Sequence, residues 1–200
     1  MKKSLVLSNG FFLSYLNKQS FGCLNLLKRE NMSYFKKFKG QSEALPTKSP
    51  ISEIAFAWFG GFISIFIIGY LTKSYDNLLI MGSFGASCVL LFGFPKSPFS
   101  QPRNVILGHF LSTLIGLAFL HILGNEYWSM ALALATAIAV MIATRTVHPP
   151  AGSNPLIVFL LGANWDYLIF PSLMGSIISV IVAIFYNNLH KNRAYPEYWL

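Results

Sequence analysis

The chain carries little charge. Asp, Glu, Lys and Arg together make up 11% of its 200 residues, whereas soluble domains carry about 25%. Such a chain cannot cover a globular surface with well-hydrated groups. In addition, 54% of its residues are hydrophobic, and its mean hydropathy is +0.53. This composition excludes a disordered chain and an ordinary soluble enzyme, and it predicts an integral membrane protein.

The chain also lacks the residues and motifs of most catalytic sites. Its two cysteines, Cys23 and Cys88, provide neither a disulfide framework nor paired metal ligands. No HExxH, CxxC or GxSxG motif occurs, and no acidic residue falls in the middle of an apolar run. Only His109 and His148 could handle protons within the membrane. We therefore predict no catalytic residue, no metal site and no cofactor, so that the protein is not an enzyme.

The charge that is present lies mainly near the N-terminus. The formal net charge is +8, and nine of the fifteen basic residues precede residue 49. Basic residues ahead of the first apolar run are typical of a cytoplasmic flank rather than of a nucleic-acid-binding surface. Residues 1–50 are therefore predicted to form a basic cytoplasmic tail. The alternative is that residues 1–31 are an extension ahead of a natural start at Met32.

Five apolar runs approach the length that crosses a bilayer as a helix, which is about 20 residues. A shorter run at residues 155–162 is either a re-entrant segment or the end of a broken crossing at residues 147–163. The prediction is an all-α polytopic transmembrane bundle over residues 51–190, with five spans or six, followed by a short aromatic tail at residues 191–200. The five runs are residues 54–71, 78–94, 104–123, 128–144 and 167–186.

Charge placement predicts the orientation of these spans. With five spans and the N-terminus inside, the inner segments carry twelve basic residues and the outer segments three. This excess supports a cytoplasmic N-terminus in the inner, or plasma, membrane. The lysine-rich composition favours a bacterial membrane over a plastid membrane. Lys191 and Arg193 would lie outside with five spans and inside with six, which leaves the side of the C-terminus open.

Small residues recur at every fourth position in three of the runs, so that each set lies on one helix face. Such faces let membrane helices approach one another closely. We interpret them as the packing surfaces of a compact bundle rather than as the lining of a pore. The sets are Gly108, Ser112 and Gly116; Ala131, Ala135, Ala139 and Ala143; and Gly175, Ser179 and Ala183.

Two proline-rich stretches, residues 94–104 and 144–155, separate the apolar runs. Proline removes a backbone donor and disfavours helix in the residue before it, so both stretches are predicted to be irregular. At membrane depth, irregular backbone survives only inside protein or beside a wet cavity, and broken segments mark the binding sites of carriers. The six prolines that break the helices are Pro95, Pro98, Pro102, Pro149, Pro150 and Pro155.

The residues around these prolines suit a small anion. Pro102 fits the first turn of a helix, whose free N–H groups and positive dipole end would lie beside Arg103. Residues 151–154 could offer successive N–H groups as an anion nest, flanked by Arg145 and His148. The alternative is that the prolines form structural turns and the arginines follow the positive-inside bias. The candidate anion-binding residues are Arg103, Asn104, His109, Arg145, Thr146, His148, Gly152, Ser153 and Asn154.

The second stretch, TRTVHPPAGSNP at residues 144–155, resembles the signature of the HPP family of integral membrane proteins, which is named for the triplet at residues 148–150. The segments GSFGAS at 82–87, LLFGFP at 90–95 and SPFSQPRNVILGH at 97–109 are similar to the family as well. The resemblance covers about residues 40–200 and implies a compact multi-helix membrane domain. Some plant plastid and cyanobacterial members are described as nitrite transporters, so it also implies transport of a small monovalent anion.

Residues and resemblance together predict a transporter of a small inorganic anion such as nitrite, with the lipid bilayer as a partner and no nucleic-acid partner. Arg103 and Arg145 would attract the anion and Gly152, Ser153 and Asn154 would coordinate it, while His148 would orient the loop or sense protonation. Five spans are few, which is compatible with a homo-oligomer. The alternatives are a non-transporting membrane scaffold or sensor subunit and, third, a membrane enzyme. A transporter should bring both stretches to a polar or basic cavity, and a scaffold should fill that space with apolar side chains.

Overall fold

A computed structural model of the chain describes residues 34–39, 44–75 and 79–199. Helices, turns and irregular segments account for all of these residues, and none of them forms a strand. The chain divides into two compact units, residues 1–48 and 49–200. In the first unit the structure describes the short 3-10 helix η1 (Tyr34–Lys39) and residues 44–48. The predictions about residues 1–31, Met32 and Cys23 fall outside the described residues.

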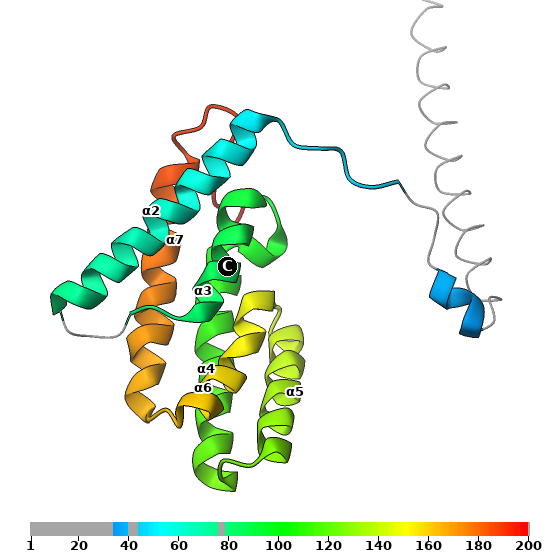
Figure 1. The fold of residues 1–200 in the computed structure, drawn as a ribbon, viewed down its shortest axis with the longest axis vertical. Coiled ribbons are helices and arrows are strands. Elements are labelled where there is room, and N and C mark those ends of the chain that lie inside the picture. The colour runs from blue at the N-terminus through cyan, green and yellow to red at the C-terminus, as the bar shows by residue number, and fades with distance from the viewer. Residues whose placement is uncertain (1–33, 40–43, 76–78, 200) are drawn as a thin grey trace, which may run out of the picture. The chain divides into compact units, whose positions relative to one another are not determined.

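The second unit is a helical bundle (Figure 1). Three helical segments, residues 51–74, 102–123 and 165–187, are long and apolar enough to cross a membrane, and shorter apolar helices cover residues 82–93 and 127–143. The predicted all-α bundle is confirmed, but its five spans are not. In chain order the elements are α2 (Ile51–Tyr75), α3 (Gly82–Cys88), η2 (Val89–Gly93), η3 (Pro98–Ser100), α4 (Pro102–Leu123), α5 (Tyr127–Ala143), η4 (Pro149–Ser153), α6 (Asn154–Leu161), η5 (Trp165–Leu168), η6 (Ile169–Leu173) and α7 (Met174–Asn187).

Prolines begin and glycines end several of these helices. Pro102 is the first residue of α4, Pro149 is the first residue of η4, and Pro155 is the second residue of α6. Proline suits these positions because its missing N–H would have no partner in the first turn. Gly124 follows α4 with a φ of 84°, and Gly162 follows α6 with a φ of 58°. Both values lie in the left-handed region that glycine adopts without strain.

The start of α2 and the end of the chain lie at the same end of the second unit (Figure 1). Arg193 pairs with the carboxylate of Glu53 in the first turn of α2, and the Tyr195 hydroxyl donates to the Ser100 carbonyl over 2.7 Å. The helical segments therefore pass an even number of times between the two ends. An even number agrees with the alternative of six spans, in which residues 147–163 form a broken crossing, but the eight-residue α6 is not among the three described helices that are long and apolar enough to cross a membrane.

Five of the six lysine and arginine residues of the second unit lie at this shared end, which we call the basic face. It comprises the start of α2, residues 94–104, residues 144–150 and residues 188–199, which are joined by side-chain hydrogen bonds. At the other end, the described charged residues are Lys73, Glu126 and Asp166. The positive-inside rule therefore predicts that the basic face is cytoplasmic. Its basic residues are Lys96, Arg103, Arg145, Lys191 and Arg193.

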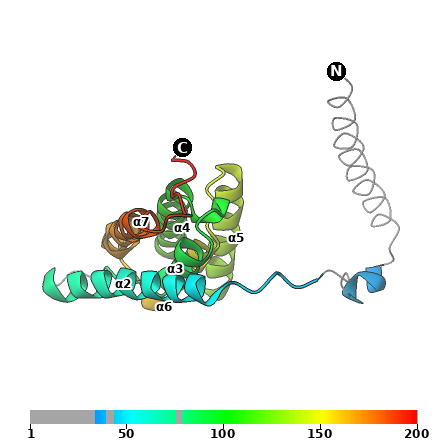
Figure 2. The same cartoon turned by 90° about the horizontal axis from the view of Figure 1, so that it is seen from above.

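Helix α4 lies at the centre of the unit, in contact with α5, η4, α6 and α7 (Figures 1 and 2). Its predicted small-residue face is buried, as is the corresponding face of α7, and both predictions are confirmed. The buried residues concerned are Gly108, Ser112 and Gly116 on α4 and Gly175, Ser179 and Ala183 on α7.

The prediction for α5 is wrong. Its predicted alanine face, at positions 131, 135, 139 and 143, is exposed. The face that α5 buries is offset by two residues from the predicted one. It carries serine and alanine residues with the same four-residue spacing. Spacing alone could not decide between the two sets. The residues that α5 buries are Ser129, Ala133, Ala137 and Met141.

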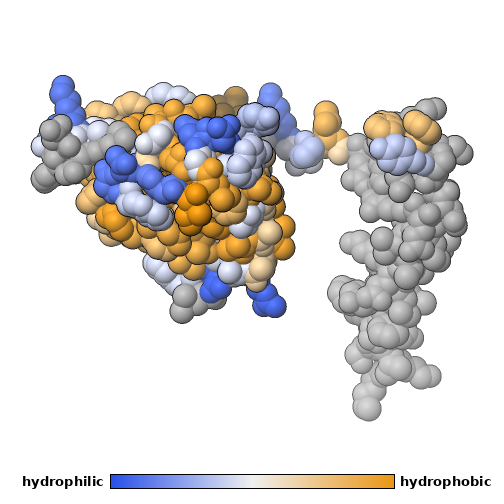
Figure 3. Space-filling view, turned by 90° about the horizontal axis from the view of Figure 1, so that it is seen from below, coloured by the Kyte–Doolittle hydropathy of each residue, from blue (hydrophilic) through white to orange (hydrophobic). Residues whose placement is uncertain are grey.

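Large apolar side chains cover much of the outside of the second unit. Trp58 and Phe66 on α2 are 66% and 61% exposed, and Phe185 on α7 is 73% exposed. Figure 3 shows orange, hydrophobic side chains over much of the face in view, with the blue, hydrophilic ones in a few clusters. A contiguous apolar surface of this kind suits contact with the hydrocarbon core of a bilayer.

The C-terminal segment is fastened to the basic face through Arg193. Besides its pairing with Glu53, Arg193 donates to the Phe92 carbonyl over 2.8 Å. Tyr195 is only 3% exposed, and burial raises the pKa of its hydroxyl well above the usual value. Residues 191–199 are therefore packed against the membrane domain and form part of its basic face.

Arg193→Ala is expected to lower the free energy of unfolding by about 2 kcal/mol, because the Phe92 carbonyl and the Glu53 carboxylate lose a charged partner. Thermal unfolding of the purified protein in detergent measures the change. Lys191→Ala is the matched control, since Lys191 is exposed on the same segment. Equal melting temperatures for the two variants would contradict the anchoring role of Arg193.

Candidate functional site

The two proline-rich stretches lie against each other at the basic face. Arg103 and Asn104 in the first stretch donate to backbone carbonyls of the second, over 3.1 and 2.9 Å. In the opposite sense, His148 Nδ1 lies 2.7 Å from the Phe99 carbonyl oxygen. A carbonyl can only accept, so His148 carries a hydrogen on Nδ1. The stretches predicted to meet near one site are therefore in direct contact.

Glycines on α4 make room for the second stretch. A Cβ atom at Gly108 would lie 2.8 Å from His148 Cβ and 3.1 Å from the Thr146 carbonyl oxygen. A Cβ atom at Gly116, two turns further along, would lie 2.9 Å from Pro155 Cα. Only a hydrogen atom fits at these two positions. The glycine face of α4 therefore lets residues 146–155 pack close to the axis of α4.

A cluster of six polar side chains, which we call the polar core, lies beneath this contact. Its members come from α3, α4, the second stretch, α6 and η6, and none of them is exposed at all. Polar groups buried inside a membrane bundle are costly unless they are hydrogen-bonded, and they commonly mark functional sites. The members of the polar core are Ser87, His109, Thr113, His148, Asn154 and Ser172.

Asn154 and Ser172 bind the polar core to α4. The amide Nδ2 of Asn154 lies 3.0 Å from His109 Nδ1, 3.3 Å from the His109 carbonyl oxygen and 2.9 Å from Thr113 Oγ1. The Ser172 hydroxyl donates to the same carbonyl over 3.1 Å and lies 2.8 Å from Thr113 Oγ1. These contacts hold α6 and η6 against the middle of α4.

Ser87 on α3 bridges the two histidines. Its Oγ lies 3.0 Å from His109 Nε2 and 2.8 Å from His148 Nε2. The centroids of the two imidazole rings are 5.0 Å apart. The hydroxyl also lies 3.2 Å from the Ser83 carbonyl oxygen one turn earlier in the same helix. The polar core is thus a continuous network that runs from the Phe99 carbonyl at the basic face to Ser172.

One atom of this network has no partner. Asn154 Oδ1 is buried and accepts no hydrogen bond in the structure. A buried acceptor left in this state costs about 1–3 kcal/mol. A ligand that brings a hydrogen-bond donor to this position would recover that energy.

The structure distributes the nine predicted residues over the polar core and its surroundings. His109, His148 and Asn154 belong to the polar core itself. Asn104 and Thr146 are buried nearby, with Thr146 Oγ1 2.7 Å from Thr144 Oγ1, and Arg103 is partly exposed at the contact between the two stretches.

Arg145, Gly152 and Ser153 lie outside the polar core. Arg145 is exposed on the basic face and has a φ of 57°, an unusual conformation for a residue other than glycine. The Ser153 hydroxyl donates to the Pro150 carbonyl over 2.8 Å, which fixes the local turn. The side chain of Gly152 is only a hydrogen, and a Cβ there would meet no neighbour.

The expected anion nest at residues 151–154 does not match the structure. These residues form the end of η4 and the start of α6. The Ala151 N–H donates to the His148 carbonyl and the Asn154 N–H to the Ala151 carbonyl. At least two of the four N–H groups are therefore used by the helix itself, because the run continues into regular helix after the prolines.

Sequence reasoning missed three members of the polar core: Ser87, Thr113 and Ser172. Serine and threonine are common in membrane helices and give no signal by themselves. Thr113 follows His109 by one helical turn, which places both on one face of α4. Ser87 lies in the GSFGAS segment that carries part of the family resemblance, and this was the available signal.

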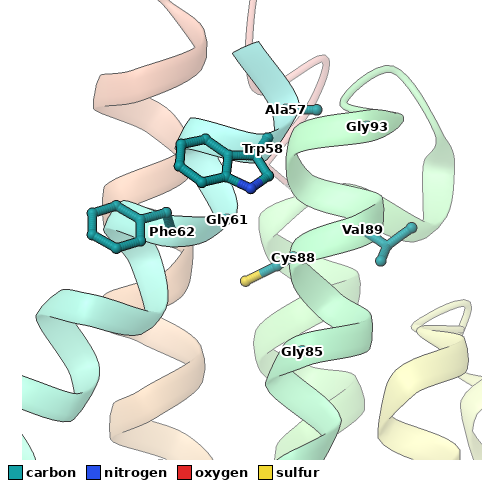
Figure 4. A pocket seen from close by; sticks show the side chains of 8 residues that line it. All are labelled: Ala57, Trp58, Gly61, Phe62, Gly85, Cys88, Val89 and Gly93. Atoms are coloured by element: carbon teal, nitrogen blue, oxygen red, sulfur yellow. The ribbon is translucent and has the colours of Figure 1, made fainter. Parts of the chain in front are cut away.

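A separate groove opens between α2 and the α3–η2 segment (Figure 4). Its volume is about 490 Å³. It contains no member of the polar core, and its lining is small or apolar, so it is not part of the candidate site. The lining residues are Ala57, Trp58, Gly61, Phe62, Gly85, Cys88, Val89 and Gly93.

Comparison with known proteins identifies relatives that align with most of this chain. Two proteins of Dictyostelium discoideum, each named only as a transmembrane protein, are 34% and 36% identical to the chain. The alignments cover 92% and 86% of this chain but 63% and 65% of the relatives, so the chain spans just under two thirds of their length. No solved structure matches the chain.

Residues 46–196 match the family described as HPP, transmembrane region. The matched segment contains both proline-rich stretches, every member of the polar core and residues 191–196 of the C-terminal segment. The match confirms the resemblance seen in the motif around residues 148–150. The chain belongs to the HPP family of transmembrane proteins.

Proposed function

We propose that the protein transports a small monovalent anion such as nitrite, with no chemical conversion of the anion. The observation that carries the proposal is the polar core, in which polar side chains from five segments meet inside an apolar bundle. Serine, threonine and asparagine also join membrane helices in an architectural role, but two fully buried histidines and an unsatisfied buried acceptor favour a functional site.

The positions of the predicted residues suggest a route for the anion that leads from the basic face to the polar core. Arg103 and Arg145 would raise the local concentration of anions at the entrance. Asn104 and Thr146 are buried just beyond, and His148 leads to the polar core. Passage would require the second stretch to move relative to α4, as broken segments do in carriers that alternate between two open states.

The proposal also covers the orientation of the protein, its membrane and its oligomeric state. We place the basic face in the cytoplasm, in accordance with the positive-inside rule. The membrane is the plasma membrane, and association of several copies is compatible with the small number of long helices. The non-transporting scaffold is the competing function, since several polar side chains in the two stretches hydrogen-bond to backbone carbonyls.

Uptake of nitrite into proteoliposomes tests the proposal, with Arg145→Ala as the paired variant. The variant is expected to lower kcat/KM for uptake about tenfold, which corresponds to about 1.4 kcal/mol of lost attraction. Arg145 is exposed, so its replacement should leave the fold intact, and Arg145→Lys should retain most of the uptake. Lys191→Ala removes an equal charge elsewhere on the basic face and should have little effect.

The outcomes separate the two functions. Uptake that depends on Arg145 but not on Lys191 supports a carrier with its entrance at the second stretch. Absence of uptake for nitrite, nitrate, chloride and formate, from protein shown to be folded, would refute the carrier and favour the scaffold.

A further inference from the structure

The hydrogen-bond chain through the polar core has a defined direction. At one end, the Asn154 amide also faces the His109 carbonyl, which can only accept, so the NH₂ group points toward His109. Its N–H therefore donates to His109 Nδ1, and neutral His109 carries its hydrogen on Nε2. At the other end, His148 Nδ1 donates to the Phe99 carbonyl, which leaves Nε2 of neutral His148 as an acceptor.

Ser87 completes the chain between these fixed ends. His109 Nε2–H donates to Ser87 Oγ. The single hydrogen of the Ser87 hydroxyl has two acceptors in reach, and it donates to His148 Nε2 over 2.8 Å in preference to the Ser83 carbonyl oxygen at 3.2 Å. Every hydrogen along the path then points from Asn154 toward Phe99 at the basic face. A chain of this kind can pass a proton by successive short transfers without moving any heavy atom far.

From this geometry we propose that the chain through His109, Ser87 and His148 moves one proton together with each transported anion. The inference rests on the proposed anion transport and names its coupling ion. An anion that crosses with a proton is a neutral acid in transit. The protein with the neutral acid bound, its loaded state, therefore buries no net charge in the bilayer. This agrees with a polar core that contains no lysine or arginine to balance an anion.

The unpartnered acceptor fits this loaded state. Asn154 Oδ1 is fully buried and lacks a donor, and the O–H of a protonated oxyacid would supply one. A free anion would bring only acceptors to the same atom. The empty acceptor therefore points to a substrate that arrives with its proton.

The proton transfer balances as follows. The acid first donates its O–H to Asn154 Oδ1, and the Asn154 amide then withdraws from His109 Nδ1 so that the acid donates to this nitrogen instead. There the O–H bond of the acid breaks and a new N–H bond forms at His109 Nδ1. The hydrogen on His109 Nε2 passes to Ser87, and the original Ser87 hydrogen passes to His148 Nε2. The hydrogen on His148 Nδ1, which the Phe99 carbonyl accepts in this structure, leaves to water when the contact between the two proline-rich stretches opens at the basic face. One proton enters and one leaves, the anion is released separately, and the rings turn over to restore the first tautomers.

No other described ionisable side chain hydrogen-bonds to the two rings. From α3 they face Ser87 and the ring of Phe84, from α6 they face Asn154, and from the first stretch His148 faces the Phe99 carbonyl. Each histidine is also a neighbour of the other. The described charged side chains make no ion pair with His109 or His148.

The test compares two driving forces for nitrite uptake into proteoliposomes. Initial rates are measured above those of protein-free vesicles, first with a pH gradient of one unit, acid outside, and then with a valinomycin-set potential at equal pH. A one-unit gradient and a potential of about 59 mV each correspond to a tenfold driving force for a single charge. For the native protein we expect the pH gradient to raise the rate severalfold and the potential to leave it unchanged.

Two serine variants test the path itself. Ser87→Ala removes the bridging hydroxyl, and we expect it to abolish the response to the pH gradient. Ser83→Ala is the matched control, because Ser83 is buried one turn earlier on α3 and its hydroxyl has no hydrogen-bond partner. Ser83→Ala should respond as the native protein does.

One result would overturn the inference: the rate of nitrite uptake by the native protein changes with the membrane potential and does not change with the pH gradient. This result would indicate transport of the anion alone. A Ser87→Ala protein that keeps the native pH response would overturn the proposed path as well. Both results would leave anion transport standing. Absence of any uptake by folded native protein would refute the transport function on which the inference rests.

Discussion

Replacing Gly175 by alanine is expected to lower the free energy of unfolding by about 3 kcal/mol, at the upper end of the range for an overpacked core. A Cβ atom at Gly175 would overlap the ring of Phe84 and would lie 2.5 Å from the Leu79 carbonyl oxygen. The carbonyl is backbone and cannot move aside as a flexible side chain could. Displacement of Phe84 would in turn disturb His109, whose ring centroid is 5.0 Å away.

Thermal unfolding in detergent measures this loss, with Gly61→Ala as the control. Gly61 is also a helical glycine, but the nearest atom to its added Cβ would be Cys88 Cβ at an ordinary 3.9 Å. Alanine is preferred over glycine in a helix by about 1 kcal/mol, so Gly61→Ala should be neutral or stabilising. If both variants melted at the same temperature, the close packing of α7 against α3 would be wrong.

His148→Ala is expected to reduce nitrite uptake at least a hundredfold, the largest functional effect of any single change considered. The variant loses the contact with the Phe99 carbonyl and the acceptor that His148 Nε2 offers to the Ser87 hydroxyl. It therefore breaks both the junction of the two proline-rich stretches and the path through the polar core. A hundredfold loss corresponds to about 2.8 kcal/mol, which is within reach of two buried hydrogen bonds.

Two further variants separate lost function from lost fold. His148→Gln keeps an amide that can donate to the Phe99 carbonyl, so it should fold like the native protein and still fail to transport. His121→Ala removes a histidine at the other end of the bundle, where its ring lies 3.2 Å from the Ala163 carbonyl oxygen. This variant should retain uptake. Normal uptake by His148→Ala would exclude the polar core as the route of the anion.

Local signals in the sequence predicted much of the scaffold. The long apolar runs, the breaks at the two proline-rich stretches and the start of α4 at Pro102 all follow from the chemistry of the residues themselves. The family resemblance was carried by the motif at residues 144–155, and the match over residues 46–196 confirms it. His109, His148 and Asn154 were predicted site residues, and the structure brings them together.

The remaining features depend on contacts between segments far apart in the chain. Ser87 matters only because α3 places it between two histidines, 22 and 61 residues away in sequence. Arg193 anchors the tail through a partner 140 residues away. The buried face of α5 could not be chosen by spacing, since two small-residue faces shared the same period.

The shared end of the second unit has a consequence for tagging and topology mapping. Glu53 at the start of α2 and Arg193 in the C-terminal segment are paired. The first and last residues of the bundle are therefore expected to lie on the same side of the membrane. A reporter joined ahead of Ile51 and another joined after Trp199 would therefore give the same compartment signal. A reporter inserted at Gly124 would give the opposite one, because that turn joins α4 and α5 at the far end.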